Sequence, residues 1–330
     1  MGDRVSTHEV DKANEVHVID YMYAKGEPIQ KIGNNYYRHT EHDSLVFHTN
    51  GKWYWNSHNT GGFGAISLAR ELYGMKFQDA VRDVNGQTIS KTVEHDISNN
   101  NKEFIYPHHY ETKTLDNAIN YLSNVRSIDP KIILALKKHD LIAEDKLKNI
   151  VFKWRDKDGN IVGADKQGTQ KIESKRGYFK QIMAESKADG GFTLDIGKPN
   201  KIAFFESPID LLSYYDIKRP TNIRLLSMSG LKDQTLIKGV QQLAREMKER
   251  GNVSDKKEKL EVIIAVDNDS AGETFRKNWK DIISEENLKI DIPTLKDWND
   301  DLRKMREHEK LNEHHKQSNF SSNKIVEIER

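Results

Sequence analysis

The sequence predicts an α/β fold, α+β over the whole chain, in which a central parallel sheet is flanked by helices. Residues 201–300 alternate short apolar runs with helical patterns, which is typical of a parallel α/β sheet. Residues 1–95 instead show strand patterns followed by helical ones, and a basic α+β segment lies between the two regions. The length of 330 residues favours two or three domains, and 36% hydrophobic residues suffice for folded cores.

The composition narrows the chemistry that the chain can perform. Lys and Arg number 52 against 51 Asp and Glu, so a nucleic-acid partner must be bound by a local patch rather than by overall charge. The chain has no Cys, which excludes disulfides, thiol catalysis, iron–sulfur clusters and cysteine-ligated zinc. No apolar run reaches the ~18 residues of a membrane span, and the N-terminus is polar. We therefore expect a soluble, cytoplasmic protein without a signal peptide or membrane partner.

The first predicted domain covers residues 1–95. Short alternating runs rich in Tyr and Trp predict strands, and Asn50-Gly51 is a turn signal between two of them. A helical pattern follows and ends at Gly74, and a second short helix comes after it. The polar stretch that follows predicts a linker over residues 96–114.

The second predicted domain covers residues 115–198 and is locally basic. A helical lead-in over 115–145 precedes a predicted β-hairpin. Residues 146–180 contain ten Lys and Arg against four Asp and Glu, interleaved with Phe and Trp. Cations can follow a nucleic-acid backbone while rings stack on bases, although a solvated hairpin would show the same composition. The candidate nucleic-acid-binding residues are Lys153, Arg155, Lys166, Lys171, Lys175, Arg176 and Lys180.

Carboxylates follow two apolar runs in the third predicted domain, residues 199–302. Glu206 follows the run 201–205 directly, and Asp267 and Asp269 follow the run 261–266. Open parallel sheets gather ligand sites at the carboxyl ends of their strands, so we expect these three side chains to meet. Hard oxygen ligands favour Mg²⁺ or Mn²⁺, which points to chemistry on a phosphodiester or a nucleoside triphosphate. Taken singly, each acid could equally be a helix cap or a solvated turn residue.

At these residues the sequence resembles the Toprim domain, the metal-binding α/β module of bacterial primases, type IA and II topoisomerases and some nucleases. The resemblance implies that Glu206 acts as a general acid or base, while Asp267 and Asp269 hold Mg²⁺ and Glu206 can share a metal. The supporting positions that it implies are Asp210, Gly230, Gly272 and Asp297.

Residues 303–330 form a charged tail that we expect to be helical and partly mobile.

The two preceding domains resemble parts of DnaG-type bacterial primases. The basic segment is similar to the subdomain that precedes Toprim in the primase core, and the N-terminal domain is similar to the primase zinc ribbon. Only His39, His42 and His58 remain as candidate zinc ligands, whereas a structural zinc site takes four ligands. We therefore expect a degenerate ribbon held by aromatic side chains, with zinc not bound. A three-histidine site and plain surface histidines are the alternatives.

The resemblance implies a DNA primase-like nucleotidyltransferase, of the DNA-directed RNA polymerase type. It would make short primers on single-stranded DNA from nucleoside triphosphates, in plasmid or mobile-element replication or transfer, beside a replicative helicase or relaxase. A metal-dependent Toprim nuclease or nickase uses the same acids to cleave. A DNA-binding accessory protein with an inactive site is the third alternative.

Overall fold

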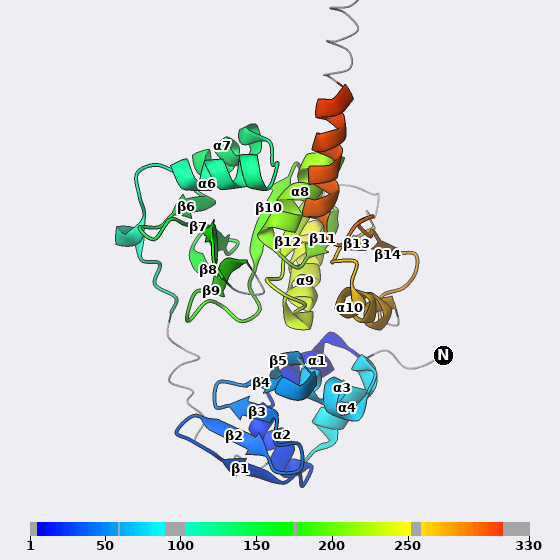
Figure 1. Cartoon of the computed structure of the whole chain (residues 1–330). Helices are drawn as coiled ribbons and strands as arrows, with labels where there is room; N and C mark the ends of the chain where they lie inside the picture. Colours follow the sequence, from blue (N-terminus) through cyan, green and yellow to red (C-terminus); the bar gives the residue numbers. More distant parts are fainter. Residues whose placement is uncertain are drawn as a thin grey trace, which may run out of the picture. The chain divides into compact units, whose positions relative to one another are not determined.

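The chain divides into two compact units. In the computed structural model, residues 1–103 with 277–284 form the first unit, and residues 104–276 with 285–330 form the second (Figure 1). The structure describes residues 5–58, 60–89, 103–173, 177–251, 259–280 and 282–312. Residues 96–102 of the predicted linker, the hairpin residues Lys175 and Arg176, and residues 313–330 of the predicted tail lie outside these ranges.

The first unit is an antiparallel sheet covered by helices. The sheet order is β1-β2-β3-β4-β5, so each strand pairs with its neighbour in sequence. The alternating burial of β2 and β4 matches the period of two read from the sequence, and Trp53 and Trp55 point into the core. The elements are α1 (Thr7–Asn14), α2 (Val18–Ala24), β1 (Ile29–Lys31), β2 (Tyr36–His39), β3 (Leu45–His48), β4 (Lys52–Trp55), η1 (Asn56–His58), β5 (Thr60–Phe63), α3 (Gly64–Tyr73) and α4 (Phe77–Gly86).

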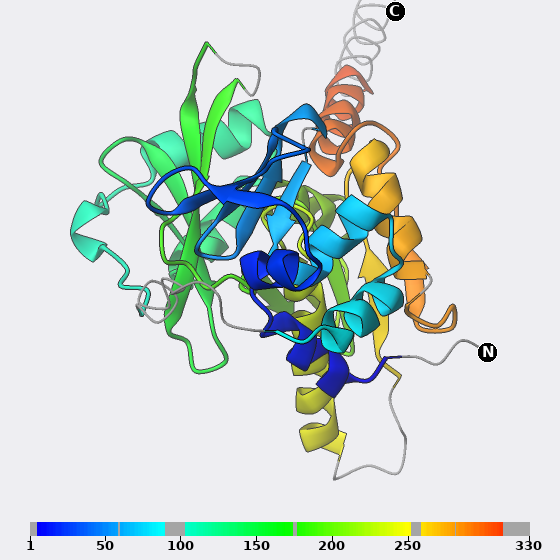
Figure 2. The same ribbon diagram turned by 90° about the horizontal axis from the view of Figure 1, so that it is seen from below.

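The second unit begins with helices and an antiparallel sheet of order β6-β7-β8-β9. Its longest strand is β8, which pairs with β7 on one side and β9 on the other (Figure 2). The helix α6 continues into a π-helical turn, η3. The elements are η2 (His108–Tyr110), α6 (Asp116–Asn120), η3 (Tyr121–Val125), α7 (Pro130–Lys138), β6 (Ile142–Glu144), β7 (Asn149–Arg155), β8 (Ile161–Lys171) and β9 (Tyr178–Ile182).

A five-stranded, mostly parallel sheet of order β10-β12-β11-β13-β14 forms the rest of the second unit. Strands β12, β11, β13 and β14 are parallel, and β10 pairs with β12 in the antiparallel sense. The strand β10 precedes the predicted boundary at residue 198, so this sheet starts inside the predicted basic segment. The elements are β10 (Phe192–Ile196), β11 (Lys201–Phe205), α8 (Pro208–Lys218), β12 (Ile223–Ser227), α9 (Asp233–Gly251), β13 (Glu261–Ile264), α10 (Ser270–Lys280) and β14 (Leu288–Ile290).

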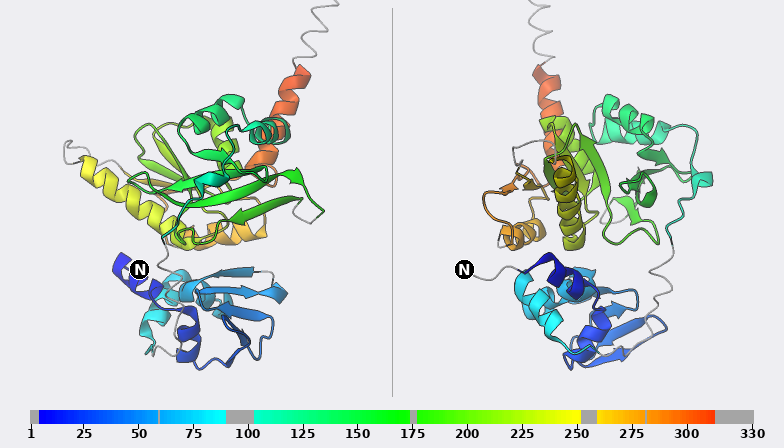
Figure 3. Two further views of the ribbon diagram at one scale, coloured as in Figure 1. Left: turned by 90° about the vertical axis from the view of Figure 1, so that its left-hand side faces the viewer. Right: turned by 180° about the vertical axis from the view of Figure 1, so that it is seen from behind.

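Alternate side chains of β11 face two different helical layers. Ile202 and Phe204 lie beside Gly239 of α9, the long helix along one face of the sheet (Figure 3). Ala203 and Phe205 belong instead to a core that contains Leu212 of α8 and residues of the helix over 298–312. Because both faces are covered, the strand is an unbroken apolar run rather than an alternating one.

The predicted α/β class is confirmed, with the parallel sheet where the sequence placed it. The predicted charged tail is helical through residue 312, the last described residue. The domain boundaries proposed from the sequence stay predictions. None of the helices in the described ranges combines the length and the apolar character needed to cross a membrane.

Candidate active site

The end of β11 places Glu206 at the carboxyl edge of the parallel sheet. Ser207 is the N-cap of α8: its hydroxyl accepts the amide N–H of Asp210 at 3.3 Å and donates to Asp210 Oδ2 at 2.5 Å. Pro208 occupies the first turn, where it loses no hydrogen bond. The strand and the cap together hold Glu206 and Asp210 at the start of one helix.

The segment after β13 brings Asp267 and Asp269 to the same edge, next to β11 in the sheet. The buried guanidinium of Arg276 donates to the carbonyl oxygen of Asp267 at 2.8 Å. The amide N–H of Gly272 donates to Asp269 Oδ1 at 2.9 Å. A Cβ at Gly272 would lie 2.0 Å from the Asp267 carbonyl oxygen, so this close approach requires glycine.

The fourth acidic segment, at residues 296–300, closes the edge from the side of the C-terminal helix. Asp297 Oδ1 accepts the amide N–H of Asp300, as a cap of the helix over 298–312. The buried indole of Trp298 donates to the Ala265 carbonyl oxygen at 2.8 Å, which fixes this segment on β13. The backbone of Asn299 also donates to the carboxylate of Asp210.

Five carboxylates therefore influence one another electrostatically. Burial, followed by the charges of Asp269 and Asp210, raises the pKa of Glu206 to about 7. Burial, followed by the charges of Asp210, Glu206, Asp297 and Asp269, raises the pKa of Asp267 to about 9. Burial and then Asp297 raise the pKa of Asp210 to about 6. Burial and mutual repulsion thus oppose the ionisation of these acids.

The carboxylate cluster suits a divalent cation. Glu206 Oε1 and Asp267 Oδ1 are buried and accept no hydrogen bond from the described residues, which is costly unless another partner occupies them. Within the described ranges, no group of three His, Asp or Glu side chains is arranged to hold a metal ion. A Mg²⁺ ion at this cluster would use one or two of the carboxylates together with waters and phosphate oxygens, which is its common mode of binding. The donor set thus fits Mg²⁺ or Mn²⁺ bound together with a phosphate-bearing substrate.

The predicted basic residues do not form one surface, because strand register divides them. Lys153 and Lys166 lie on one face of the β7–β8–β9 sheet, whereas Lys180 pairs with Gln167 and shares the other face with Asp165. Among the predicted basic residues that the structure describes, Lys180 lowers the pKa of Glu206 by its charge, against the burial that raises it. Lys180 is therefore the predicted cation that reaches the acidic site.

Lys153 is a correction to the predicted nucleic-acid surface. Its side chain is 1% exposed, and its ammonium group pairs with Glu111 at 2.7 Å and Asp140 at 2.5 Å. Arg155 also pairs with Asp140, and Lys166 pairs with the buried Asp145 at 3.1 Å. These three cations pair with acids of the same unit, so their charge is already neutralised within the fold.

The remaining candidate nucleic-acid-binding residues lie at the end of β8 and in the hairpin that follows it. Lys171 ends β8 and is exposed, where it can meet a nucleic acid. Lys175 and Arg176 lie outside the described residues.

His39 has no lone pair left for a metal. Its Nδ1 accepts the amide N–H groups of Glu41 at 3.2 Å and His42 at 3.1 Å. The proton must then sit on Nε2, which donates to Glu27 Oε2 at 2.9 Å. His39 is a buried structural histidine in this arrangement.

The other two predicted histidines flank a tryptophan. The ring of His58 stacks on Trp55 with centroids 3.7 Å apart, and the ring of His42 lies 5.2 Å from the same indole. Aromatic contacts thus connect β4 with the residues at which the resemblance places zinc ligands. Whether this domain binds a metal stays a prediction.

Two family models match the chain. A model described as Toprim-like matches residues 203–302, and a model described as a protein of unknown function (DUF3991) matches residues 120–198. The Toprim resemblance inferred from Glu206, Asp267 and Asp269 is therefore confirmed. The second match covers the sheet that carries Lys180.

An uncharacterized protein of Bacillus anthracis, pXO2-78, is 30% identical over 329 residues, which cover 94% of this chain and 93% of that protein. The chain belongs to the same family as this protein. The family thus combines the Toprim-like domain with the region that precedes it, over nearly the full length of both chains.

Solved structures of primases show a distant likeness. The primase fragment of the bacteriophage T7 primase-helicase protein has a TM-score of 0.42 and 14% identity, covering 82% of this chain and 93% of that one. The zinc-binding and RNA polymerase domains of the Aquifex aeolicus primase have a TM-score of 0.34 and 14% identity, covering 92% and 85%.

Sequence reasoning missed two residues beside the Toprim-like site. Asp165 stands alone among lysines, so it resembles a local counter-charge, and Arg276 resembles any exposed residue of a polar helix. Both are buried: Asp165 accepts a hydrogen bond from the Ser229 hydroxyl, and Arg276 donates one to the Asp267 carbonyl oxygen. These contacts join residues that are distant in the sequence or unremarkable in it, so they are visible only in the structure.

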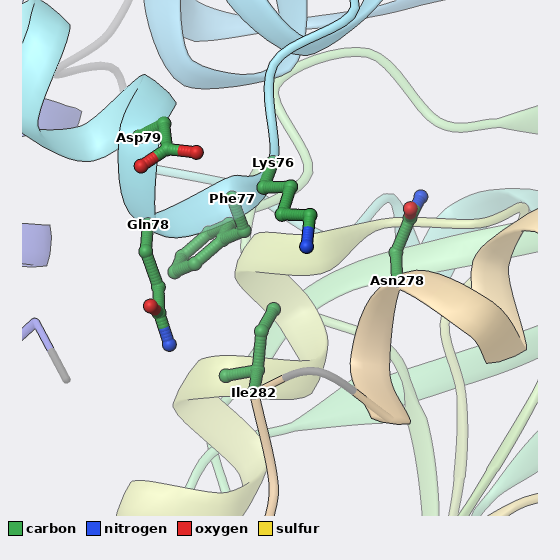
Figure 4. Close-up of a pocket in the computed structure, with 6 residues that line it drawn as sticks. All are labelled: Lys76, Phe77, Gln78, Asp79, Asn278 and Ile282. Carbon is green, nitrogen blue, oxygen red and sulfur yellow. The ribbon is translucent and has the colours of Figure 1, made fainter. Parts of the chain in front are cut away.

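A small pocket in the first unit is separate from this chemistry. It is lined by Lys76, Phe77, Gln78, Asp79, Asn278 and Ile282 (Figure 4). The lining contains one carboxylate and none of the Toprim-like acids. We assign no role to it.

Proposed function

We propose that the protein is a metal-dependent nucleotidyltransferase that synthesises short primers on single-stranded DNA. The observation that carries this proposal is the buried carboxylate cluster, in which Glu206 and Asp267 each keep an oxygen that accepts no hydrogen bond from any described residue. The match of residues 203–302 to a Toprim-like model supports the same chemistry.

The acids would divide the work at the cluster. Asp267 and Asp269 would hold Mg²⁺ or Mn²⁺, which would neutralise the triphosphate and the charge that develops on it. The terminal hydroxyl oxygen of the primer forms a bond to the α-phosphorus, and the bond to pyrophosphate breaks. Glu206, whose pKa is raised to about 7, accepts the hydroxyl proton at Oε1 or serves as a ligand of a second ion.

The template would pass β9 at Lys180, the cation whose charge acts on Glu206. Lys180 is exposed and forms no salt bridge with another described residue. The setting that the sequence resemblance implies is plasmid or mobile-element replication or transfer, with a helicase or relaxase exposing the template.

The test is primer synthesis on mixed-sequence single-stranded DNA with labelled nucleoside triphosphates and Mg²⁺ or Mn²⁺. We expect short template-dependent products from the unchanged protein. In Asp267→Asn and Glu206→Gln, synthesis should fall about a hundredfold or more while DNA binding is kept. Glu249→Gln is the matched control, because this exposed acid lies in the last turn of α9, at the opposite edge of the sheet.

Three outcomes would contradict the proposal. Full synthesis by Asp267→Asn would remove the acids from the reaction. Metal-dependent degradation of the DNA without nucleotides would identify a nuclease or nickase instead. DNA binding without synthesis, cleavage or any stabilisation by metal and nucleotides would indicate an accessory protein.

A further inference from the structure

The turn over residues 228–230, directly after β12, is anchored on the strand that carries Glu206. The amide N–H of Met228 donates to the Phe205 carbonyl oxygen at 2.8 Å, and that of Gly230 donates to the Glu206 carbonyl oxygen at 2.8 Å. Gly230 has φ of 108°, which is open to glycine and strained for other residues. Any shift in this turn would therefore move the backbone of Glu206.

Ser229, in the middle of the turn, adopts an unfavourable backbone conformation. Its φ is 55°, in the left-handed region where a Cβ crowds the backbone. Such a residue persists only when its surroundings determine its conformation. Here the Ser229 hydroxyl donates to Asp165 Oδ2 at 2.7 Å, and Asp165 lies on β8 in the other sheet of the unit.

Asp165 is a rigid acceptor. Its Oδ2 also accepts the indole N–H of Trp154 at 2.7 Å, and the Trp154 side chain is fully buried. Burial raises the pKa of Asp165, while the hydrogen bonds from Ser229 and Trp154 and the charges of Lys232 and Lys180 oppose that rise. A buried carboxylate held in this way cannot follow a moving turn without losing its partners.

We propose that Asp165 is a positioning residue for the Toprim-like site: through Ser229 it holds the 228–230 turn, and the turn holds the backbone of Glu206. The region of unknown function would thus act directly on the geometry of the acids. This inference rests on the proposed function for the role of the acids. The hydrogen-bonded connection from Asp165 through Ser229 to the backbone of Glu206 can be tested without measuring any activity.

The test compares Ser229→Ala with Ser229→Gly. Both variants lose the hydroxyl, and both leave the Asp165–Trp154 hydrogen bond in place. They differ only in the Cβ, so alanine keeps the strain at φ of 55° without the bond that offsets it, while glycine adopts that conformation freely. A positioning role predicts that the turn loosens in the alanine variant and stays formed in the glycine variant.

Two readouts are needed. The first is amide hydrogen exchange at Met228 and Gly230, which requires no ligand: we expect about tenfold faster exchange in Ser229→Ala and little change in Ser229→Gly. The second is the affinity for Mn²⁺ alone, which we expect to fall by up to about tenfold in the alanine variant only.

Equal loosening in the two Ser229 variants would show that the hydrogen bond to Asp165 holds the turn whatever the backbone strain, which still supports the positioning role. No loosening in either variant would show that the turn is held without Asp165, and this result overturns the inference. If the unchanged protein binds no Mn²⁺ and makes no primers, the proposed function fails, and the exchange comparison still decides the positioning role.

A second pair of variants separates positioning from stability. Asp165→Leu removes the acceptor from both Ser229 and Trp154, so we expect loss of thermal stability and loss of protection in the turn. Adding Ser229→Gly to Asp165→Leu should restore the protection of Gly230 but not the thermal stability. If the double variant recovers neither, Asp165 acts only in the core and the inference is wrong.

Discussion

Two buried acidic regions of the second unit have opposite electrostatic character. Asp145 accepts backbone N–H groups from Leu147 and Asn149 at 2.9 Å and pairs with Lys166, and these contacts outweigh burial and lower its pKa. Glu206 and Asp267 are buried beside other acids, each has an oxygen without a partner among the described residues, and both have raised pKa values. The comparison separates an acid whose ionised form the fold stabilises from acids whose ionised form it disfavours, which is typical of functional sites.

The largest effect on stability is expected at the satisfied acid. Asp145→Ala strands the Lys166 ammonium group and the amide groups of Leu147 and Asn149, so the free energy of unfolding should fall by about 2–4 kcal/mol. Chemical denaturation with and without Mg²⁺ measures it, and the loss should be the same in both. A loss below about 1 kcal/mol would show that Asp145 is no structural anchor.

The opposite sign is expected at Asp267. Because its pKa is raised to about 9, the folded protein must keep Asp267 protonated near neutral pH, which costs stability; Asp267→Asn removes this cost while keeping the shape, so the metal-free protein should gain about 1–3 kcal/mol. The same variant should lose the stabilisation that Mg²⁺ or Mn²⁺ gives to the unchanged protein. Thermal unfolding with and without metal measures both, with Glu249→Gln as the control. Lower stability without metal would mean that Asp267 serves the fold.

A third acid extends the comparison to the first unit. Burial opposes the ionisation of Glu27, but hydrogen bonds from Tyr73 at 2.6 Å and from His39 at 2.9 Å outweigh it, and its pKa is lowered from 4.5. Because the folded state binds the proton less readily, this stabilisation is present above pH 4.5 and is lost as the pH falls below it.

The variant Glu27→Gln should therefore be about 1 kcal/mol less stable than the unchanged protein near neutral pH. The difference should shrink when both are unfolded well below pH 4.5. Denaturant titrations at the two pH values check this. A difference that does not change with pH would show that the ionised carboxylate is not what stabilises this unit.

The acids could be predicted from the sequence because local signals place them. An apolar run followed by Glu206, and a second run followed by Asp267 and Asp269, define strand ends, and Ser207 with Pro208 defines a helix start. Parallel pairing then brings the strand ends to one edge. Each step depends on residues that are close in the chain.

The basic surface could not be predicted in the same way, because it depends on register between distant strands. Lys153 and Lys180 look alike in the sequence, yet pairing across β7, β8 and β9 sends them to opposite faces. Glu111 and Asp140, which neutralise Lys153, lie in other segments, and the sequence gives no sign of this pairing. The same holds for Asp165 and Ser229, which are 64 residues apart.

The smallest predicted effect tests this division of the lysines. Lys180→Gln should weaken binding to single-stranded DNA by about 1 kcal/mol and reduce the slope of affinity against salt concentration by about one unit, because one phosphate contact is lost. Lys248→Gln is the matched control: this exposed lysine lies near the end of α9, at the edge of the sheet opposite the acids. Fluorescence anisotropy over a range of salt concentrations measures both. Equal losses in the two variants would indicate diffuse attraction rather than a nucleic-acid face, and the template would then have to reach the acids by another surface.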